Sequence, residues 1–144
     1  MKILAFLFLF CSFVSFPQTN GDKYNDDVDV TVSLKKLEIK SGGTAQLIIN
    51  FKPKKGIHIN LDPPIEIELE KNFASKGKTE IPKMKKESYL NTEKPLKQNI
   101  TLKKNITPGA HTLKGKLNYF YCSDSEGWCS RFTQDFQLNI KVIN

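Results

Sequence analysis

Beyond Phe16 the chain has no continuous apolar stretch, and it contains only three cysteines, two histidines and one tryptophan. A bilayer-crossing helix needs about 20 consecutive apolar residues, so no transmembrane segment is predicted after residue 16. The sequence also lacks internal repeats and low-complexity stretches, and no segment has the apolar period of a long amphipathic helix. These absences exclude a membrane-spanning core, a repeat protein and an all-helical fold.

Positive charge is in excess but is not concentrated. The chain has 22 Lys and Arg against 15 Asp and Glu, a formal net charge of +7, and its lysines alternate with acidic residues. Such a distribution is typical of a solvated surface. A nucleic-acid-binding protein would show a basic stripe with stacking aromatic residues or a recognisable module, and neither is present. We therefore predict no nucleic-acid partner.

The first twenty residues have the layout of a secretory signal peptide. Lys2 is followed by an apolar run over residues 3–16 and then by polar residues up to Asn20. We predict a signal peptide over residues 1–20, cleaved between Ser15 and Gly21, and a periplasmic or secreted location. Residues 21–144 are enough for one domain with its own core.

Cys11 lies inside this apolar run, which raises the alternative of a lipid anchor. Lipoprotein signals place small residues directly before the modified cysteine, whereas Phe8, Leu9 and Phe10 are all large. The signal-peptide interpretation is therefore preferred, and Cys11 is removed with the signal.

The remaining residues alternate between apolar and polar side chains in short segments separated by turns, which is typical of half-buried β-strands. We expect Lys71–Lys97 to be mostly loop, because this stretch is rich in lysine and is interrupted by Gly77 and two prolines. Several short strands in about 120 residues predict an all-β, immunoglobulin-like, two-sheet antiparallel β-sandwich. The expected strands are Val28–Leu34, Ala45–Phe51, Ile57–Asn60, Ile65–Leu69, Ile100–Leu102, Leu113–Tyr121 and Phe132–Val142.

Cys122 and Cys129 flank the loop between the last two expected strands, and in an exported protein a mutual disulfide is the first expectation. A bridge closing so short a loop stabilises the fold by about 2.5 kcal/mol in the chain-entropy model. At an exposed hairpin tip it is also open to attack by another thiolate. Asp124 and Glu126 disfavour a thiolate nearby, whereas Arg131 favours one. A structural bridge and an exchanging bridge both stay open.

Two further alternatives would use His58 and His111. A zinc site made from these histidines and the two cysteines has unfavourable spacing, since structural zinc cysteines usually lie two to four residues apart. A Cys–His hydrolase needs an unpaired thiol, which the second cysteine would cap by oxidation. We predict no metal and no cofactor, and we expect His58 to be a hydrogen-bonded or surface histidine rather than a base.

Two segments together resemble a known family. Gly56–Pro64 has a glycine, a histidine two residues later, an asparagine two residues after that, and then prolines. In Tyr119–Cys129 a tyrosine-rich strand ends in a cysteine, a short acidic loop follows, and a second cysteine opens the final strand. This pattern is similar to the N-terminal periplasmic domain of the thiol:disulfide interchange protein DsbD and its stand-alone relatives.

The resemblance implies an immunoglobulin-like sandwich that works as a component of a protein-disulfide reductase. Its partners would be a membrane-bound thiol–disulfide electron donor and oxidised periplasmic thiol proteins, and Cys122 and Cys129 would be the exchanging pair. Cys129 is the better candidate for the attacked sulfur because it neighbours Arg131 and the bend at Gly127. The alternative function is a non-catalytic exported binding or structural module with an inert disulfide.

Overall fold

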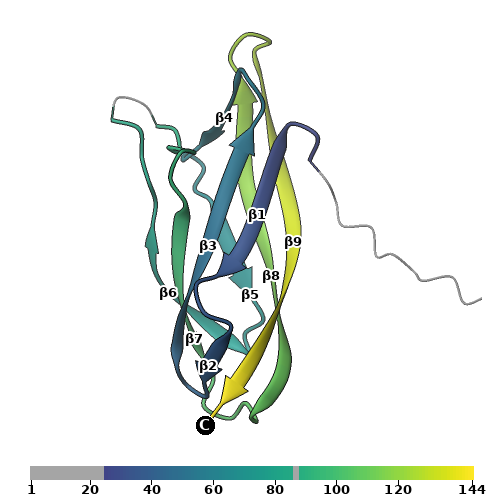
Figure 1. Cartoon of the computed structure of the whole chain (residues 1–144). Helices are drawn as coiled ribbons and strands as arrows, with labels where there is room; N and C mark the ends of the chain where they lie inside the picture. Colours follow the sequence, from purple (N-terminus) through teal and green to yellow (C-terminus); the bar gives the residue numbers. More distant parts are fainter. Residues whose placement is uncertain (1–24, 86–87) are drawn as a thin grey trace, which may run out of the picture.

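The computed structural model describes residues 25–85 and 88–144, so the predicted signal peptide and Cys11 lie outside the described residues. The described part is built from β-strands packed as two layers (Figure 1). Among these residues, no helix is long and apolar enough to cross a lipid bilayer. In chain order the strands are β1 (Val28–Leu34), β2 (Glu38–Lys40), β3 (Thr44–Pro53), β4 (Ile57–Asn60), β5 (Glu66–Leu69), β6 (Ala74–Glu80), β7 (Leu96–Leu102), β8 (Gly109–Ser123) and β9 (Trp128–Ile143).

One sheet has the strand order β1-β3-β7-β6, and the other has the order β2-β9-β8-β4, with β5 also pairing with β8. The predicted all-β, two-sheet fold is confirmed. Every pairing between named strands is antiparallel except that of the short β2, which runs parallel to β9. β1 and β2 belong to different sheets, so the chain crosses from one sheet to the other between these two strands.

The core lies between the two sheets and follows from the two-residue period of the strands. In β7, for example, Leu96, Gln98, Ile100 and Leu102 are buried, and the residues between them are only partly buried. Each fully buried aliphatic or aromatic side chain contributes about 1.5–3 kcal/mol relative to its exposed state. The largest fully buried apolar side chains are Phe51, Leu47, Ile49, Ile59, Leu96, Ile100, Leu113 and Leu117.

Tyr119 is a polar anchor inside this core. Its side chain is fully buried, its ring meets that of Phe51 edge-on at 5.3 Å, and its hydroxyl accepts a hydrogen bond of 2.9 Å from Asn25 Nδ2. Burial raises the pKa of Tyr119 to about 12, against the smaller opposing effect of the Asn25 hydrogen bond. The bond ties the start of the described chain to the central strand β8.

The expectation that Lys71–Lys97 is mostly loop was wrong for Ala74–Glu80, which forms β6. This strand lies at the edge of its sheet and all of it except Ala74 is exposed, so it has no apolar alternation to reveal it. Backbone pairing with β7 holds it, with a register shift between Lys76 and Thr79. A lysine-bearing, irregular edge strand resists pairing with other chains.

The predicted corner at Pro63 and Pro64 separates β4 from β5. Both strands pair antiparallel with β8, β4 with Phe120–Ser123 and β5 with Gly115–Asn118. Proline lacks the backbone N–H of a sheet ladder, which explains why pairing stops at this corner. As a result β4 lies beside the end of β8 that carries Cys122.

Candidate functional site

The β8–β9 hairpin forms one end of the molecule, and the C-terminus lies at the other end (Figure 1). The two strands stay in register up to the pair Ser123 and Trp128. The loop between them is closed by a hydrogen bond of 2.9 Å from Gly127 N to Ser123 O. Gly127 has a φ of 69°, a conformation that suits glycine, and Ser123 Oγ accepts a hydrogen bond of 3.3 Å from Glu126 N.

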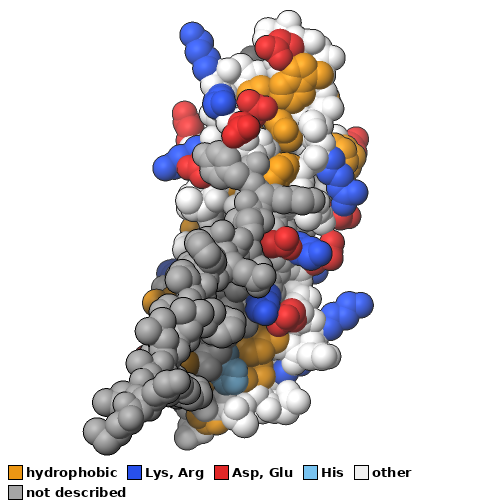
Figure 2. Space-filling model, turned by 90° about the vertical axis from the view of Figure 1, so that its right-hand side faces the viewer, with side chains coloured by type: hydrophobic (Ala, Val, Ile, Leu, Met, Phe, Trp, Pro, Cys, Tyr) orange, Lys and Arg blue, Asp and Glu red, His pale blue; other side chains and the backbone are white. Residues whose placement is uncertain are grey.

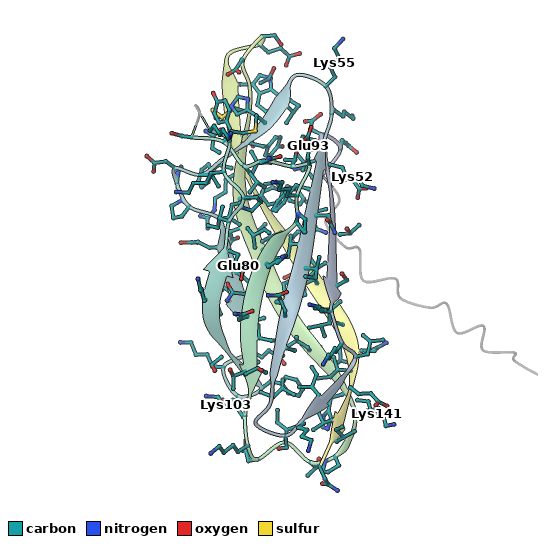
Figure 3. All side chains as sticks on the ribbon, turned by 60° about the vertical axis from the view of Figure 1, so that its left-hand side comes forward. Lys52, Lys55, Glu80, Glu93, Lys103 and Lys141 are labelled. Atoms are coloured by element: carbon teal, nitrogen blue, oxygen red, sulfur yellow. A yellow bond between two sulfur atoms is a disulfide. The ribbon has the colours of Figure 1, made fainter. Side chains whose placement is uncertain are left out.

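Cys122 and Cys129 form a disulfide, which confirms the pairing expected from the sequence. The two residues are direct partners in the antiparallel ladder, and their Cα atoms lie 4.1 Å apart. This short separation fits a non-hydrogen-bonded pair, in which side chains lie closest. Figure 3 shows the sulfur atoms in yellow at the end that also carries Lys55, away from Lys103 and Lys141.

The bridge lies on the outer face of the five-stranded sheet. Tyr119 and Tyr121 point into the core, so the alternation of the strand places Cys122 on the opposite face. The two cysteines nevertheless differ in exposure: Cys122 has only 4% of its surface accessible, whereas Cys129 is exposed. Cys129 is therefore the more accessible half of the bridge.

His58 flanks the buried cysteine on the other side. It is the direct partner of Cys122 across the β4–β8 pair, so three residues stand in one row across the sheet, in the order His58, Cys122 and Cys129. Directly opposed residues of an antiparallel pair project to the same face with Cβ atoms about 4.5–5.5 Å apart. The imidazole is thus a lateral neighbour of the Cys122 side chain.

Two other segments hold this imidazole in place. The ring of Tyr89 stacks on it with 3.8 Å between centroids and 30° between planes, and Asp124 Oδ2 lies 3.4 Å from Nδ1. Tyr89 is positioned by backbone hydrogen bonds on both sides of it, from Leu61 N to Ser88 O and from Leu90 N to Ile59 O. The His58 side chain is 17% exposed as a result.

The charged side chains that were predicted to act on the cysteine pair contact other groups as well. Arg131 lies over the ring of Phe120 at 5.9 Å and places Nη2 3.8 Å from Glu66 Oε2. The carboxylate of Glu126 accepts a hydrogen bond from the indole of Trp128. The guanidinium is therefore shared with a carboxylate rather than directed only at Cys129.

Aromatic side chains surround the exposed end of the hairpin. Trp128 meets the ring of Tyr121 edge-on at 5.6 Å, and both pack at the margin of the core. Figure 2 shows hydrophobic side chains gathered at this end of the molecule, with acidic side chains beside them. This surface combines apolar area with a few charges, as binding surfaces commonly do.

The four residues of the zinc alternative do not come together. His111 lies near the opposite end of β8 from Cys122, where it contacts Thr107 O at 2.7 Å and the ring of Phe73. A strand rises about 3.3 Å per residue, so this histidine is about 35 Å from the bridge. No group of three or more His, Cys, Asp or Glu side chains suited to a metal occurs among residues 25–85 and 88–144.

Comparison with known proteins gives the fold and no family. No family model matches the chain, and no curated protein matches it. A cohesin module from a Clostridium perfringens family 33 glycoside hydrolase has a TM-score of 0.53 at 9% identity, covering 81% of this chain and 96% of that chain. AggA, the major subunit of Escherichia coli aggregative adherence fimbriae type I, has a TM-score of 0.42 at 11% identity, covering 83% and 98%. The cohesin likeness shows the sandwich fold alone.

Proposed function

We propose that this chain is a periplasmic thiol–disulfide exchange module that relays electrons from a membrane-bound donor to oxidised exported proteins through Cys122 and Cys129. The observation that carries the proposal is the unequal exposure of the two cysteine residues, of which Cys129 is exposed and Cys122 is buried. Exchange requires a thiolate to reach one sulfur of the bridge along a defined path. A bridge with one accessible sulfur fixes which atom a partner attacks.

The forward step is a balanced exchange. The donor's thiolate attacks Cys129 Sγ, the bond between Cys129 Sγ and Cys122 Sγ breaks, and its electron pair remains on Cys122 Sγ. A mixed disulfide now joins the donor to Cys129. A second thiolate of the donor then attacks the donor sulfur of this mixed disulfide, and Cys129 leaves as a thiolate. Both cysteines of the module are now reduced, and the donor carries a disulfide. The reduced pair repeats the sequence in reverse on an oxidised protein.

The fold can accommodate a reduced state. The bridge joins residues that the β8–β9 ladder already pairs, and it closes a loop of only eight residues, worth about 2.5 kcal/mol in the chain-entropy model. A domain typically has about 5–15 kcal/mol of stability. The core between the two sheets lies on the other face of the sheet from the bridge, so we expect reduction to leave the core contacts in place.

The equilibrium reduction potential of the pair tests the proposal. We expect thiol trapping across a glutathione and dithiothreitol series to give a value above about −300 mV, with a reduced form that stays folded. A value below this, or unfolding on reduction, would show that the bridge is structural.

Partner capture supplies a matched pair of variants. Cys122→Ala leaves an exposed thiol at Cys129 and should accumulate mixed disulfides with oxidised exported proteins. Cys129→Ala leaves only the buried Cys122 and should accumulate few. Equal capture by the two variants would contradict the assignment of Cys129 as the attacked sulfur.

A second candidate function is a non-catalytic exported binding or structural module with an inert disulfide. The observation that favours it is electrostatic: Asp124 and Glu126 lie in the loop next to the bridge, and the nearby Arg131 is shared with Glu66. Reactive cysteines usually lie in electropositive surroundings, which these contacts do not provide. The comparisons also support this candidate better than the exchange function, because the sandwich fold is shared with a cohesin module and no comparison points to thiol–disulfide exchange. The reduction potential distinguishes the two functions.

A further inference from the structure

The burial of Cys122 affects any exchange at this site. When Cys129 is attacked, Cys122 Sγ leaves as a thiolate, yet Cys122 is only 4% exposed. Burial disfavours the charged form of a thiol because the thiolate loses its hydration. Exchange at this bridge therefore needs a nearby group that supplies a proton to the leaving sulfur.

We infer that His58 is this group, acting as a general acid on Cys122 Sγ in one direction and as a general base in the other. The inference rests on the proposed exchange function and extends it to a third residue. His58 is the direct cross-strand neighbour of Cys122, on the side away from Cys129, so it does not obstruct the attacking thiolate. The sequence alone favours a hydrogen-bonded or surface histidine over a base at this position; the cross-strand pairing, which places His58 on the same face of the sheet as Cys122, is the observation that supports a proton-transfer role.

The groups that face His58 suit a proton donor. The Asp124 carboxylate lies 3.4 Å from Nδ1, and Tyr89 stacks on one face of the ring. A surface pocket lined by Gly56, Ile57, His58, Tyr89, Asp124 and Ser125 connects the ring to solvent. A second pocket on the β4 side also borders His58 and contains Glu93 as its charged residue. The first pocket lets the imidazole regain a proton from water after each transfer.

The proton and the electrons balance in this step. As the Cys129–Cys122 bond breaks, the electron pair goes to Cys122 Sγ, and the imidazolium of His58 transfers its proton to that sulfur, becoming neutral. In the reverse direction the neutral imidazole takes the proton from the Cys122 thiol. The resulting thiolate then attacks Cys129 Sγ of the mixed disulfide and releases the partner as its thiolate.

The test is the rate at which dithiothreitol reduces the oxidised mature protein. The rate is divided by the concentration of dithiothreitol thiolate and is measured at several pH values between about 5 and 8, the range in which histidine side chains titrate. For the wild type this rate should fall as the pH rises, because the proton donor is lost. His58→Gln should be slower at low pH and independent of pH. Positioned proton donors typically contribute about 100-fold or more, and because a thiolate is a weak base we expect about 10-fold here.

Three controls separate catalysis from folding. His111→Gln changes the chain's other histidine, at the far end of β8, and should behave as the wild type does. His58→Phe keeps an aromatic ring against Tyr89 and should be as slow as His58→Gln. Asp124→Asn removes the carboxylate that lies 3.4 Å from Nδ1 and helps to hold the ring, and should lower the rate toward that of His58→Gln.

The outcomes distinguish the inference from the function it rests on. A pH-dependent wild type with slow, pH-independent His58 variants would support the role of His58. Wild-type rates and pH profile in His58→Gln and His58→Phe would overturn it while exchange at Cys129 stands. If dithiothreitol does not reduce the folded wild type, the exchange function itself is wrong, and the role of His58 is lost with it.

Discussion

Raising the pH above 10 should destabilise this protein through Tyr119. Its side chain is buried, and burial raises its pKa to about 12 in the folded state, whereas the ordinary pKa of a tyrosine is 10.0. Between these two values the unfolded chain loses the proton and the folded chain keeps it. The stabilising effect is therefore complete below pH 10 and is lost as the pH rises toward 12.

The size of the effect follows from these two pKa values. One unit of pKa difference corresponds to about 1.4 kcal/mol, so the free energy of unfolding should fall by about 1.4 kcal/mol between pH 9 and pH 11 on account of Tyr119 alone. Other groups also titrate in this range, so the quantity to measure is a difference between two proteins.

Urea unfolding of the wild type and of Tyr119→Phe at pH 7, 9 and 11 gives that difference. At pH 7 the variant should be less stable by about 1–3 kcal/mol, because the buried Asn25 Nδ2 loses its hydrogen-bond partner. Between pH 9 and pH 11 the gap should narrow by about 1.4 kcal/mol. A gap that stays constant over this range would refute the argument that Tyr119 resists ionisation in the folded state.

Two other predictions concern the sheet and the bridge. Gly115→Ala should destabilise the fold by about 1–3 kcal/mol in urea unfolding, because the added Cβ would clash with the Phe136 ring and would lie 2.6 Å from Glu68 O. Gly77→Ala, whose Cβ would make an ordinary 3.4 Å contact, is the matched control and should change stability far less. After mild reduction, iodoacetamide should alkylate the exposed Cys129 faster than the buried Cys122, as peptide mapping can show; equal rates would mean that the burial of Cys122 does not persist in the reduced form.

The core strands were predictable because each buries one face, so that apolar and polar residues alternate along its sequence. Val28–Leu34 was predicted with its bounds as found, and β3, β8 and β9 were found to extend one to four residues beyond the predicted bounds at each end. β6 was not predictable in this way, since six of its seven residues are exposed and its pairing partner β7 is distant in sequence. The three-residue β2 is held by its parallel register with β9, which no local pattern reveals.

The bridge was predictable for a similar reason. Two cysteines on either side of a short loop between two strong strands must lie near each other whatever the rest of the fold does. Its environment was not predictable, because it depends on the register between β4 and β8, segments that are some sixty positions apart in the chain. The stack of Tyr89 on His58 depends on a third segment again.

The alternation of side chains along β8 connects these observations to function. Because Tyr119 and Tyr121 point inward, the alternation of the strand requires Cys122 to point outward, and the bridge must lie outside the sandwich core. The burial of Cys122 must therefore come from neighbours on the same face, one of which is His58. A sulfur covered by a few surface side chains, rather than by the core, can change its oxidation state while the sandwich beneath it keeps its packing, which is the property that an exchange module requires.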